Sequence, residues 1–453
     1  MKVPWREQEW QRVAVYGLGA SGLAATRLLR SRGVEVVGVD MREGHELDLG
    51  DLEKDPGFDA LLGGDPQELL ERIDGVVISP GVSPRRPLIV AAREAGLPVV
   101  AEVELAYLFA DGPLIGITGS NGKSTTTLMT GELLKAAGFA VEICGNIGVP
   151  LSARVDGEAG RIFVTELSSF QLEAVDTFRP QAAAMLNLSA DHLDRHRDHE
   201  SYFAAKRNLF DNQQSTDVAV LNADDEQVAA VAVPARRRFF SRRRQVDDGC
   251  YLDGEIVVEV DPETGRHPLF SRGDVPVPGP HNLENAMAAA LLSRAAGADP
   301  EVFPSALAKF QGLPHRLQRV ADQRGVVWYD DSKATNFAAT LRSLEGFADG
   351  SVHLIVGGRN KGGDPAVLTD VVRRKVCRLY LVGEAAVEIG AALAGVVGAE
   401  MAGTLETAVE AAARRAGQGE VVLLSPSCAS FDQYQSFAER GDHFQILVRG
   451  LDG

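Results

Sequence analysis

The chain has 453 residues, which is long for a single hydrophobic core and indicates three domains at roughly 150 residues each. Charged residues make up 24% of the chain and hydrophobic residues 45%, as in soluble globular proteins. The formal net charge of −17 argues against a nucleic-acid-binding protein, whose binding face would be basic.

The first twelve residues, MKVPWREQEWQR, are charged where a secretory signal would be apolar. No stretch approaches the roughly 20 apolar residues of a membrane span. The four cysteines are scattered without a C-x-x-C pair, which is typical of reduced thiols and not of a disulfide framework or a zinc site. We therefore expect a cytoplasmic monomer that contacts neither membrane nor nucleic acid.

Residues 12–40 are typical of a strand, a glycine turn, a helix and a second strand that ends at Asp40. Gly17, Gly19 and Gly22 permit a tight turn with backbone N–H groups exposed at the helix N-terminus, where an anion is favoured. With Asp40 about 20 residues on, this matches the dinucleotide fingerprint. The pattern indicates a nucleotide diphosphate without selecting NAD, so an NAD-dependent dehydrogenase stays open.

More α/β units follow in chain order. We expect further strands of the first segment at 75–84 and 97–109. In the central segment we expect strands at 113–118, 161–173 and 217–225, a hairpin at 250–260 around Asp253-Gly254, and helices at about 124–138 and 279–297, the latter with Asn282 as N-cap. The last segment is expected to have strands at 326–336, 353–358, 378–383 and 421–426 that alternate with helices. The basic cluster RRRFFSRRR (236–244) is expected to form a solvated hairpin edge.

The predicted fold class is α/β, in three domains. They are a Rossmann-like N-terminal domain (1–103), a central P-loop ATPase-type domain with a mainly parallel sheet and a small β subsheet (104–313), and a Rossmann-like C-terminal domain (314–453).

Residues 116–125, GITGSNGKST, form a shortened P-loop. The common pattern G-x-x-x-x-G-K-[ST] is not met, because Ile117 stands where its first glycine belongs. The loop's backbone N–H groups would still surround phosphate oxygens, and Lys123 would reach toward the β- and γ-phosphates. The hydroxyl of Ser124 or Thr125 would face Mg²⁺.

Two other places carry candidate metal ligands. Glu166 ends a predicted strand, where a carboxylate could bind a metal ion. His192, His196 and His199 stand at helical spacing within 190–200, which leaves a zinc site, a single functional His192 and a charged helix face as open interpretations.

Two polar loops follow strands of the last segment. DDSKATN (330–336) combines two carboxylates, the ammonium of Lys333 and two hydroxyls. GGRNKGGD (357–364) is a glycine loop with a lysine, which suits anion binding. Cys428 is expected to be a packed cysteine, because no base can be assigned to it.

The chain resembles the ATP-dependent Mur ligases of bacterial cell-wall synthesis over nearly its whole length. The motifs that carry the resemblance, in chain order, are GLGASG, TGSNGKST, ELSSFQLE, NLSADHLDRH, FAAK, HNLENA, GLPHR, DDSKATN, GGRNKG and SPSCASFDQY. The DSKATN motif points to the D-glutamate-adding member. The resemblance also implies UDP, not NAD, at the first glycine fingerprint.

The resemblance implies a reaction in peptidoglycan precursor synthesis that proceeds through an acyl phosphate. The γ-phosphoryl group of ATP is transferred to the carboxylate of UDP-N-acetylmuramoyl-L-alanine. The amine of D-glutamate then attacks the acyl phosphate, and the products are an amide, ADP and phosphate. Such a reaction requires charge neutralisation around the phosphate and close placement of three substrates.

The resemblance also implies roles for individual residues. The implied catalytic residues are Lys123, Glu166, His192 and Lys206, with Mg²⁺ at two sites, one held by Ser124 and Glu166 and the other by His192 and a carbamylated Lys206. The implied ATP-binding residues are Gly119, Ser120, Asn121, Gly122, Lys123, Ser124, Thr125, Thr126, Asn282, Asn285, Arg316, Asp331 and Lys333. The implied UDP-substrate residues are Ala20, Ser21, Asp40, Met41, Arg42, Gly81, Asn146 and His192. The implied D-glutamate residues are Thr335, Lys361, Ser430 and Phe437.

Lys206 is the unusual member of this set. An ammonium has hydrogen-bond donors and no acceptor, so it cannot bind Mg²⁺, whereas a carbamate offers hard oxygen ligands. Phe203 and Phe210 lie about one helical turn away on a similar face, which indicates that this face is buried. An ordinary surface lysine remains the alternative.

Other functions stay open at this point. They are a sister Mur ligase that adds another amino acid, a ligase like folylpolyglutamate synthetase, the dehydrogenase, and a non-catalytic NTP switch.

Overall fold

The computed structural model describes all residues except 1–2, 6–7, 158, 190–194 and 452–453. It divides into two compact units. The first unit comprises residues 1–272 and 284–307, and the second comprises 273–283 and 308–453. The sheets confirm the predicted α/β class. Among the described residues, no helix is both long and apolar enough to cross a membrane.

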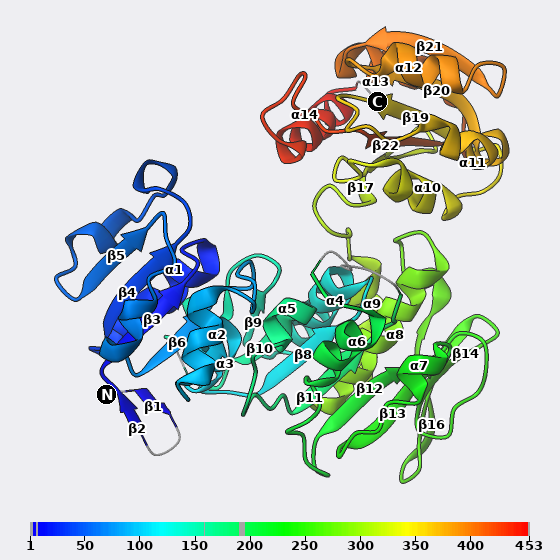
Figure 1. Cartoon of the computed structure of the whole chain (residues 1–453). Coiled ribbons are helices and arrows are strands. Elements are labelled where there is room, and N and C mark those ends of the chain that lie inside the picture. The colour runs from blue at the N-terminus through cyan, green and yellow to red at the C-terminus, as the bar shows by residue number, and fades with distance from the viewer. Residues whose placement is uncertain (1–2, 6–7, 158, 190–194, 452–453) are drawn as a thin grey trace. The chain divides into compact units, whose positions relative to one another are not determined.

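The N-terminal part of the first unit contains a parallel sheet in the order β5-β4-β3-β6-β7 (Figure 1). Its strands are β3 (Arg12–Tyr16), β4 (Glu35–Asp40), β5 (Phe58–Leu62), β6 (Gly75–Ile78) and β7 (Val99–Ala101), and its helices are α1 (Ala20–Ser31), α2 (Pro87–Glu94) and α3 (Glu102–Tyr107). A two-stranded antiparallel ribbon of β1 (Val3–Trp5) and β2 (Gln8–Trp10) precedes it. The second strand, β4, ends at Asp40, as predicted.

The central sheet of the first unit has nine strands in the order β16-β15-β14-β13-β12-β11-β8-β10-β9. The strands are β8 (Leu114–Thr118), β9 (Val141–Gly145), β10 (Ile162–Glu166), β11 (Ala182–Met185), β12 (Val218–Asn222), β13 (Arg236–Ser241), β14 (Gly249–Asp253), β15 (Ile256–Asp261) and β16 (Gly265–Ser271). Strands β8 to β14 pair in parallel, and β15 and β16 extend the sheet antiparallel. The Asp253-Gly254 hairpin is confirmed, with Asp253 paired to Ile256.

Helices flank this sheet, and α4 follows β8 directly. The helices are α4 (Lys123–Ala136), α5 (Ser169–Leu172), α6 (His199–Arg207), α7 (Glu226–Ala229), α8 (Pro280–Ala295) and α9 (Phe303–Ala308). Asn282 lies inside α8 and is not its N-cap, because the helix begins at Pro280.

The prediction of a hairpin edge for 236–244 is wrong, although Arg236, Arg237, Arg243 and Arg244 are exposed to solvent, as predicted. Strand β13 lies inside the sheet, between β12 and β14. The Arg238 guanidinium is buried and bonds to Asp248 and Glu259, at 3.0 and 2.8 Å. These carboxylates neutralise the charge, which allows an arginine-rich segment to occupy an interior strand.

The second unit contains a six-stranded sheet in the order β17-β18-β22-β19-β20-β21. The elements are β17 (Gln318–Gln323), β18 (Val326–Asp330), α10 (Phe337–Glu345), β19 (Val352–Gly357), α11 (Thr369–Lys375), β20 (Val376–Val382), α12 (Ala386–Ala392), β21 (Gly398–Gly403), α13 (Leu405–Arg415), β22 (Val421–Ser427) and α14 (Phe437–Arg449). Only β17 runs antiparallel, so the prediction of a mostly parallel sheet is confirmed. The remaining short helices of the chain are 3-10 turns at Gly44–Glu46, Gly50–Lys54, Gln67–Arg72, Leu151–Ala153, Arg272–Asp274, Pro300–Val302 and Pro365–Leu368.

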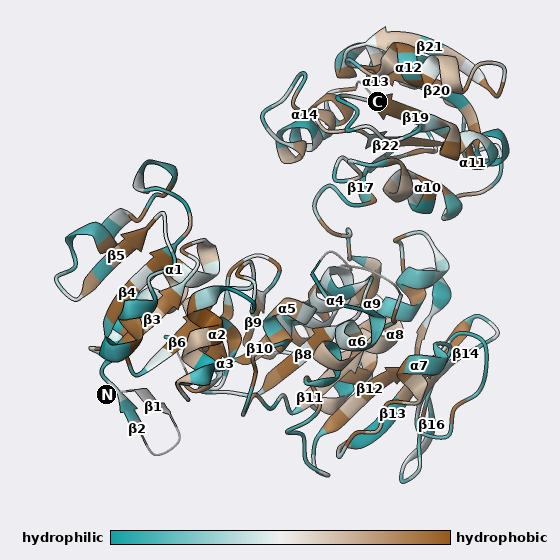
Figure 2. Cartoon of the chain, in the orientation of Figure 1, coloured by the Kyte–Doolittle hydropathy of each residue, from teal (hydrophilic) through white to brown (hydrophobic). Residues whose placement is uncertain are grey.

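The strands carry the hydrophobic cores of both units (Figure 2). One continuous cluster runs from the N-terminal sheet to the central sheet, which explains why both belong to one unit. Two buried carboxylates also join them: Glu102 accepts from the Ser152 N–H at 2.8 Å, and Glu104 accepts from the Phe178 N–H at 3.0 Å. In the second unit, two clusters cover the two faces of the sheet.

Candidate active site

The shortened P-loop connects β8 to α4. Gly122 is the last residue of the loop, has φ +84° and directly precedes α4. The backbone N–H groups of the loop therefore lie at the N-terminus of this helix, where an anion is favoured. A Cβ atom at Gly122 would lie 2.3 Å from the Asn285 Oδ1 atom, so this position has no room for another residue. Asn285 therefore lies against the loop.

The segment after β11 holds the loop from behind. The Ser120 N–H donates to the Asn187 carbonyl at 3.0 Å, and the Asn121 N–H donates to the Asn187 Oδ1 atom at 2.8 Å. The Ser120 hydroxyl donates to the Ser189 carbonyl at 3.1 Å. These bonds hold the loop against the segment that follows β11. The sequence motifs did not single out Asn187, although it stands in the quoted stretch NLSADHLDRH.

Lys123 folds back over its own loop. Its Nζ atom donates to the carbonyl oxygens of Gly119 and Ser120, at 2.8 and 3.0 Å. Ser124 is half-buried in the first turn of α4, while Thr125 and Thr126 are buried. The buried hydroxyl of Thr126 makes no hydrogen bond with any described residue.

Lys206 on α6 reaches the same loop from another part of the chain. Its side chain is 1% exposed, and its Nζ atom donates to the Gly119 carbonyl at 2.9 Å. The Thr118 hydroxyl lies 3.4 Å away, and the ammonium lies 4.6 Å from the centre of the Tyr202 ring. The burial predicted for this face of α6 is confirmed, and the surface-lysine alternative is wrong.

Tyr202 is a site residue that the sequence analysis did not identify. Its ring contacts Lys206, and its hydroxyl lies 3.1 Å from the Ser120 hydroxyl. Its position one helical turn before Lys206 was the available signal, since residues four apart share a helix face.

Glu166 ends β10, next to β8 in the sheet. It is buried, and its Oε1 atom accepts from the Asn146 amide at 2.8 Å. The Oε2 atom is also buried but accepts no hydrogen bond from any described residue. A buried carboxylate oxygen without a partner is costly, and a Mg²⁺ ion would satisfy it with the hard oxygen ligand that this ion prefers. The donor chemistry around Glu166 and the P-loop therefore fits Mg²⁺ and a nucleotide phosphate.

The three histidines of 190–200 have different outcomes. His192 lies outside the described residues. His196 is buried, and its Nε2 atom lies 2.9 Å from the Ser169 hydroxyl, while its Nδ1 atom lies 3.3 Å from Glu173. His199 begins α6. Neither His196 nor His199 belongs to a group of side chains able to hold a metal ion, as far as the structure describes the chain.

Most of the predicted UDP-substrate residues lie at or just after the carboxyl ends of β3, β4 and β6, whereas Asn146 follows β9 of the central sheet and His192 lies outside the described residues. Asp40 accepts hydrogen bonds from the Leu18 N–H at 2.7 Å and from the Arg42 N–H and guanidinium. Burial raises the pKa of Asp40, but these bonds from Arg42 and Leu18 outweigh it and lower the pKa to about 2. Ala20 and Ser21 begin α1, and Met41, Arg42 and Gly81 are exposed nearby on the chain. This edge of the sheet therefore carries a fixed carboxylate, a cation and a helix N-terminus.

The second unit contains several of the predicted ATP-binding residues. Asp331 is buried, accepts from the Leu317 N–H, and receives the hydroxyls of Ser343 and Ser425 at 2.7 Å each. Burial raises the pKa of Asp331 to about 6 against these bonds. Arg316, next to Leu317, is exposed. Asn282 is buried in the same unit, and its amide donates to the Pro278 carbonyl at 2.7 Å.

The loops at this end of the sheet also meet one another. The Lys333 Nζ atom lies 5.8 Å from the centre of the Phe437 ring, and the Ser332 hydroxyl donates to the Phe437 carbonyl at 2.8 Å. The Arg359 N–H donates to the Ala429 carbonyl at 2.8 Å, which brings the 357–364 loop beside Ser430. Thr335 and Lys361 lie on these two loops, half-buried and exposed respectively.

Arg440 is another residue that the sequence motifs did not indicate. It is buried and donates to the Ser332 hydroxyl and the Ser332 carbonyl, at 2.9 Å each, and to the Cys428 carbonyl at 3.2 Å. Ser427, at the end of β22, has φ +61°, a strained value for a non-glycine residue that is often found at functional sites. Cys428 is buried, as predicted.

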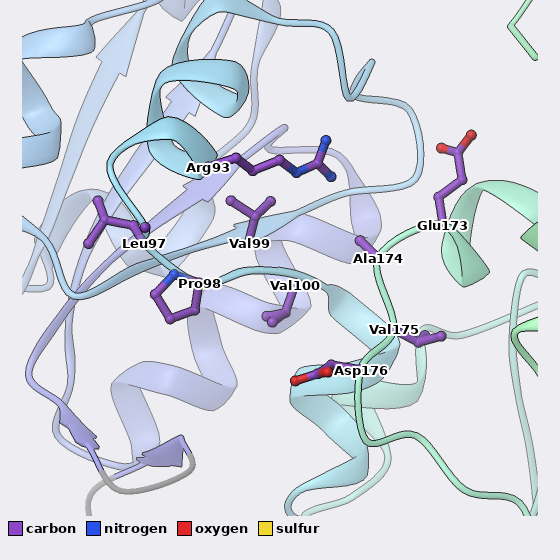
Figure 3. Close-up of a pocket in the computed structure, with 10 residues that line it drawn as sticks. Arg93, Leu97, Pro98, Val99, Val100, Glu173, Ala174, Val175 and Asp176 are labelled. Atoms are coloured by element: carbon purple, nitrogen blue, oxygen red, sulfur yellow. The ribbon is translucent and has the colours of Figure 1, made fainter. Parts of the chain in front are cut away.

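A pocket of about 450 Å³ lies elsewhere in the first unit, between β7 and the segment after α5 (Figure 3). Arg93 borders it on one side and Glu173 and Asp176 on the other. None of its lining residues is among the predicted site residues. The candidate active site is thus defined by strand-end loops and not by this pocket.

Three family profiles match the chain. Residues 11–101 match the MurD-like N-terminal domain of Mur ligases, residues 117–293 match the Mur ligase middle domain, and residues 315–428 match the Mur ligase glutamate ligase domain.

Curated relatives match over nearly the full length. A UDP-N-acetylmuramoylalanine--D-glutamate ligase of Koribacter versatilis is 41% identical over 447 residues, which cover 97% of this chain and 98% of the relative. The enzyme of the same name from Geobacillus kaustophilus is 43% identical over 456 residues, which cover 99% of both chains.

Solved structures support the fold. A UDP-N-acetylmuramate-alanine ligase of Thermotoga maritima has a TM-score of 0.56 at 17% identity and covers 98% of this chain and 100% of its own. A UDP-N-acetylmuramoyl-L-alanyl-D-glutamate--2,6-diaminopimelate ligase has a TM-score of 0.57 at 18% identity, with 97% and 92% covered. The profiles and the near full-length identity lead to one conclusion: the chain belongs to the Mur ligase family.

Proposed function

We propose that this chain is an ATP-dependent ligase that adds D-glutamate to UDP-N-acetylmuramoyl-L-alanine in peptidoglycan precursor synthesis. It acts as a cytoplasmic monomer. Relatives at 41–43% identity over nearly the whole chain carry the name of this activity. We also propose that the chain is divided into three domains, with boundaries at residues 103 and 313.

The observation that carries the proposal is the buried Lys206 side chain beside the P-loop. A P-loop alone indicates only a nucleoside triphosphate. A second lysine, whose Nζ atom lies 2.9 Å from the Gly119 carbonyl, places another titratable side chain beside the loop where the γ-phosphate would be transferred.

The first step joins the substrate carboxylate to phosphorus. A carboxylate oxygen of the L-alanyl group attacks the γ-phosphorus of ATP, the bond to the β-γ bridging oxygen breaks, and ADP leaves. Negative charge spreads over the transferring oxygens, so the backbone N–H groups of 119–124 and the Lys123 ammonium would stabilise this step. Binding would require Lys123 to exchange its bonds to Gly119 and Ser120 for phosphate oxygens.

Mg²⁺, when bound, would neutralise phosphate charge at this site. Glu166 and Ser124 would hold one ion, since the Glu166 Oε2 atom is buried without a described hydrogen-bond partner. We propose that Lys206 is carbamylated by CO₂ and that, with His192, it holds a second ion. Carbamylation removes the ammonium and supplies two oxygen ligands.

The second step forms the amide. The neutral amine of D-glutamate attacks the acyl carbon, the carbon–oxygen bond to phosphate breaks, and the amine loses a proton. We place D-glutamate at the loops of the second unit, where Lys361 would pair with a carboxylate and Thr335, Ser430 and Phe437 would complete the site. Arg316, Asp331 and Lys333 would contribute to ATP binding from the same unit.

The other substrate would bind the N-terminal sheet. A helix N-terminus at Ala20 and Ser21 suits the diphosphate of UDP, and the Asp40–Arg42 pair with Met41 and Gly81 would complete the nucleotide site. Asn146, which bonds to Glu166, would contact the muramoyl-alanine end near the metal.

Phosphate release with ATP, Mg²⁺, UDP-N-acetylmuramoyl-L-alanine and an amino-acid panel tests the function. Release is expected with D-glutamate, with a product heavier by one glutamyl residue. L-Glutamate, lysine and diaminopimelate serve as matched alternatives. Turnover with one of these in preference to D-glutamate would indicate a sister ligase, and an absorbance change with NAD(P)H would indicate a dehydrogenase; either result would overturn the proposal.

A further inference from the structure

Three donor side chains meet at the amino ends of neighbouring strands in the second unit. His353 lies near the start of β19, Cys377 near the start of β20, and Glu420 directly before β22. These strands are adjacent in the sheet, in the order β22-β19-β20 (Figure 1). The proposed D-glutamate loops follow the opposite, carboxyl ends. Strands of six or seven residues span roughly 20 Å, so the two places are separate.

The donor atoms of the three side chains already lie close together. The His353 Nε2 atom lies 3.0 Å from the Glu420 Oε2 atom. One ring nitrogen of His353, the Cys377 sulfur and one carboxylate oxygen of Glu420 all lie within 4.8 Å of one another. Tetrahedral Zn²⁺ has ligand distances of about 2.0–2.3 Å, so its donor atoms are roughly 3.3–3.6 Å apart. Changes of at most about 1.5 Å in the distances between donor atoms would bring them to that spacing.

Neighbouring groups orient the imidazole of His353 and the carboxylate of Glu420. The His353 Nδ1 atom hydrogen-bonds to the hydroxyl of Tyr380, which is fully buried, at 2.9 Å. That bond leaves Nε2 directed at Glu420. The Gly417 N–H donates to the Glu420 Oε2 atom at 2.6 Å and fixes the carboxylate. Histidines that bind metals commonly have such an oxygen partner on the second ring nitrogen.

The set is also accessible from solvent. The His353 side chain is 5% exposed, but that of Glu420 is 33% exposed, and Cys377 is partly exposed. The Cys377 thiol donates only a weak, sulfur-type hydrogen bond, to the Val352 carbonyl at 3.2 Å. An ion could therefore enter past Glu420 and displace the thiol proton.

We propose that His353, Cys377 and Glu420 form a Zn²⁺-binding site, with water as the fourth ligand. A nitrogen, a sulfur and a carboxylate oxygen are the donors of protein zinc sites, whereas Mg²⁺ prefers oxygen alone. The ion would join the beginnings of three strands. It is separate from the Mg²⁺ that the proposed ligase reaction uses.

Cobalt is the probe that reports the sulfur ligand directly. Chelator-treated full-length protein is titrated with Co²⁺, and a thiolate-to-cobalt charge-transfer band is expected in the near ultraviolet. Zn²⁺ should then abolish the band by displacement. Cys377→Ser should show no band, while Cys250→Ala, which removes a buried thiol of the first unit, should keep it.

Two further variants make the test independent of the sulfur. Glu420→Gln keeps the size of the side chain and removes its charge. Tyr380→Phe removes the hydroxyl that hydrogen-bonds to the His353 Nδ1 atom. Each should weaken Zn²⁺ binding, measured by competition with a chromophoric chelator, by roughly tenfold or more. Circular dichroism verifies the folding of each variant. A folded wild-type protein without the band, or unchanged Zn²⁺ affinity in Glu420→Gln and Tyr380→Phe, would overturn the proposal.

Discussion

The Nζ atom of Lys206 donates a hydrogen bond to the carbonyl oxygen of Gly119, 87 positions earlier in the chain, at 2.9 Å. The lysine is buried and its ammonium also lies over the Tyr202 ring. This contact connects α6 to the phosphate-binding loop.

Lys206→Ala is expected to nearly abolish ligation without unfolding the protein, because it removes the proposed carbamate ligand of Mg²⁺. Lys206→Arg is the matched variant: it keeps a cation but cannot form the carbamate, so it should be equally inactive. Formate or acetate should restore part of the activity of Lys206→Ala. ADP release measures the rate, and circular dichroism verifies the fold. Full activity in either variant would contradict the carbamate.

Lys123→Ala should lower kcat by roughly 10²-fold or more, because a charge that stabilises the transferring phosphate is lost. Lys135→Ala provides the control in the same helix, since Lys135 is exposed at the end of α4 and pairs with the exposed Glu132. Near-normal turnover by a folded Lys123→Ala protein would refute the assignment of the phosphate site.

How much the sequence predicts depends on how local the determinants are. The P-loop was predictable because a strand, its glycines and its lysine are contiguous, and the fold places them as expected. The burial of Lys206 followed from Phe203 and Phe210, which lie about one turn before and after it in the sequence. Its contact with Gly119 was not predictable from local pattern, because it depends on how β8 and α6 pack.

The strand at 236–241 also occupies a position that its local sequence pattern did not predict. Its arginines predicted a solvated edge, and Arg236 and Arg237 are exposed, but β13 lies between β12 and β14 and Arg238 is buried. The carboxylates that neutralise Arg238 come from Asp248 and Glu259, which only the folded sheet brings near. Buried ion pairs of this kind leave no periodic signal in the sequence.

Glu166→Gln should raise the Mg²⁺ concentration needed for half-maximal activity by roughly tenfold or more, because an amide oxygen is a weaker ligand than a carboxylate. Glu132→Gln, which changes an exposed glutamate on α4, is the control. Rates measured across a Mg²⁺ titration give the answer. An unchanged Mg²⁺ requirement in Glu166→Gln would remove this residue from the metal site.

Lys361→Ala should raise the KM for D-glutamate by roughly 10- to 100-fold and leave the KM for ATP nearly unchanged, because a charge-assisted bond contributes about 1.5–3 kcal/mol. Arg373→Ala removes an exposed cation on α11 of the same unit and should change neither constant. If the KM for D-glutamate stays the same in Lys361→Ala, the amino acid binds elsewhere.

Asp331 gives a pH-dependent term in stability. Burial raises its pKa from 3.8 to about 6, so the folded protein holds this proton more tightly than the unfolded chain. Its contribution is therefore favourable at low pH and declines as the pH rises from about 4 to 6. Asp331→Asn has no titrating carboxyl group at this position. Its free energy of unfolding relative to wild type should therefore rise over that pH window, by up to roughly 3 kcal/mol. Urea unfolding at several pH values measures the difference, and parallel curves for the two proteins would contradict it.

The acyl-phosphate route is the central claim, and oxygen transfer tests it most directly. UDP-N-acetylmuramoyl-L-alanine labelled with ¹⁸O in its carboxylate is converted with unlabelled ATP and D-glutamate, and the released phosphate is analysed by mass spectrometry. The attacking carboxylate oxygen stays on phosphorus when the amide forms, so each phosphate released in ligation should carry one atom of ¹⁸O. Unlabelled phosphate accompanying amide formation would contradict the account.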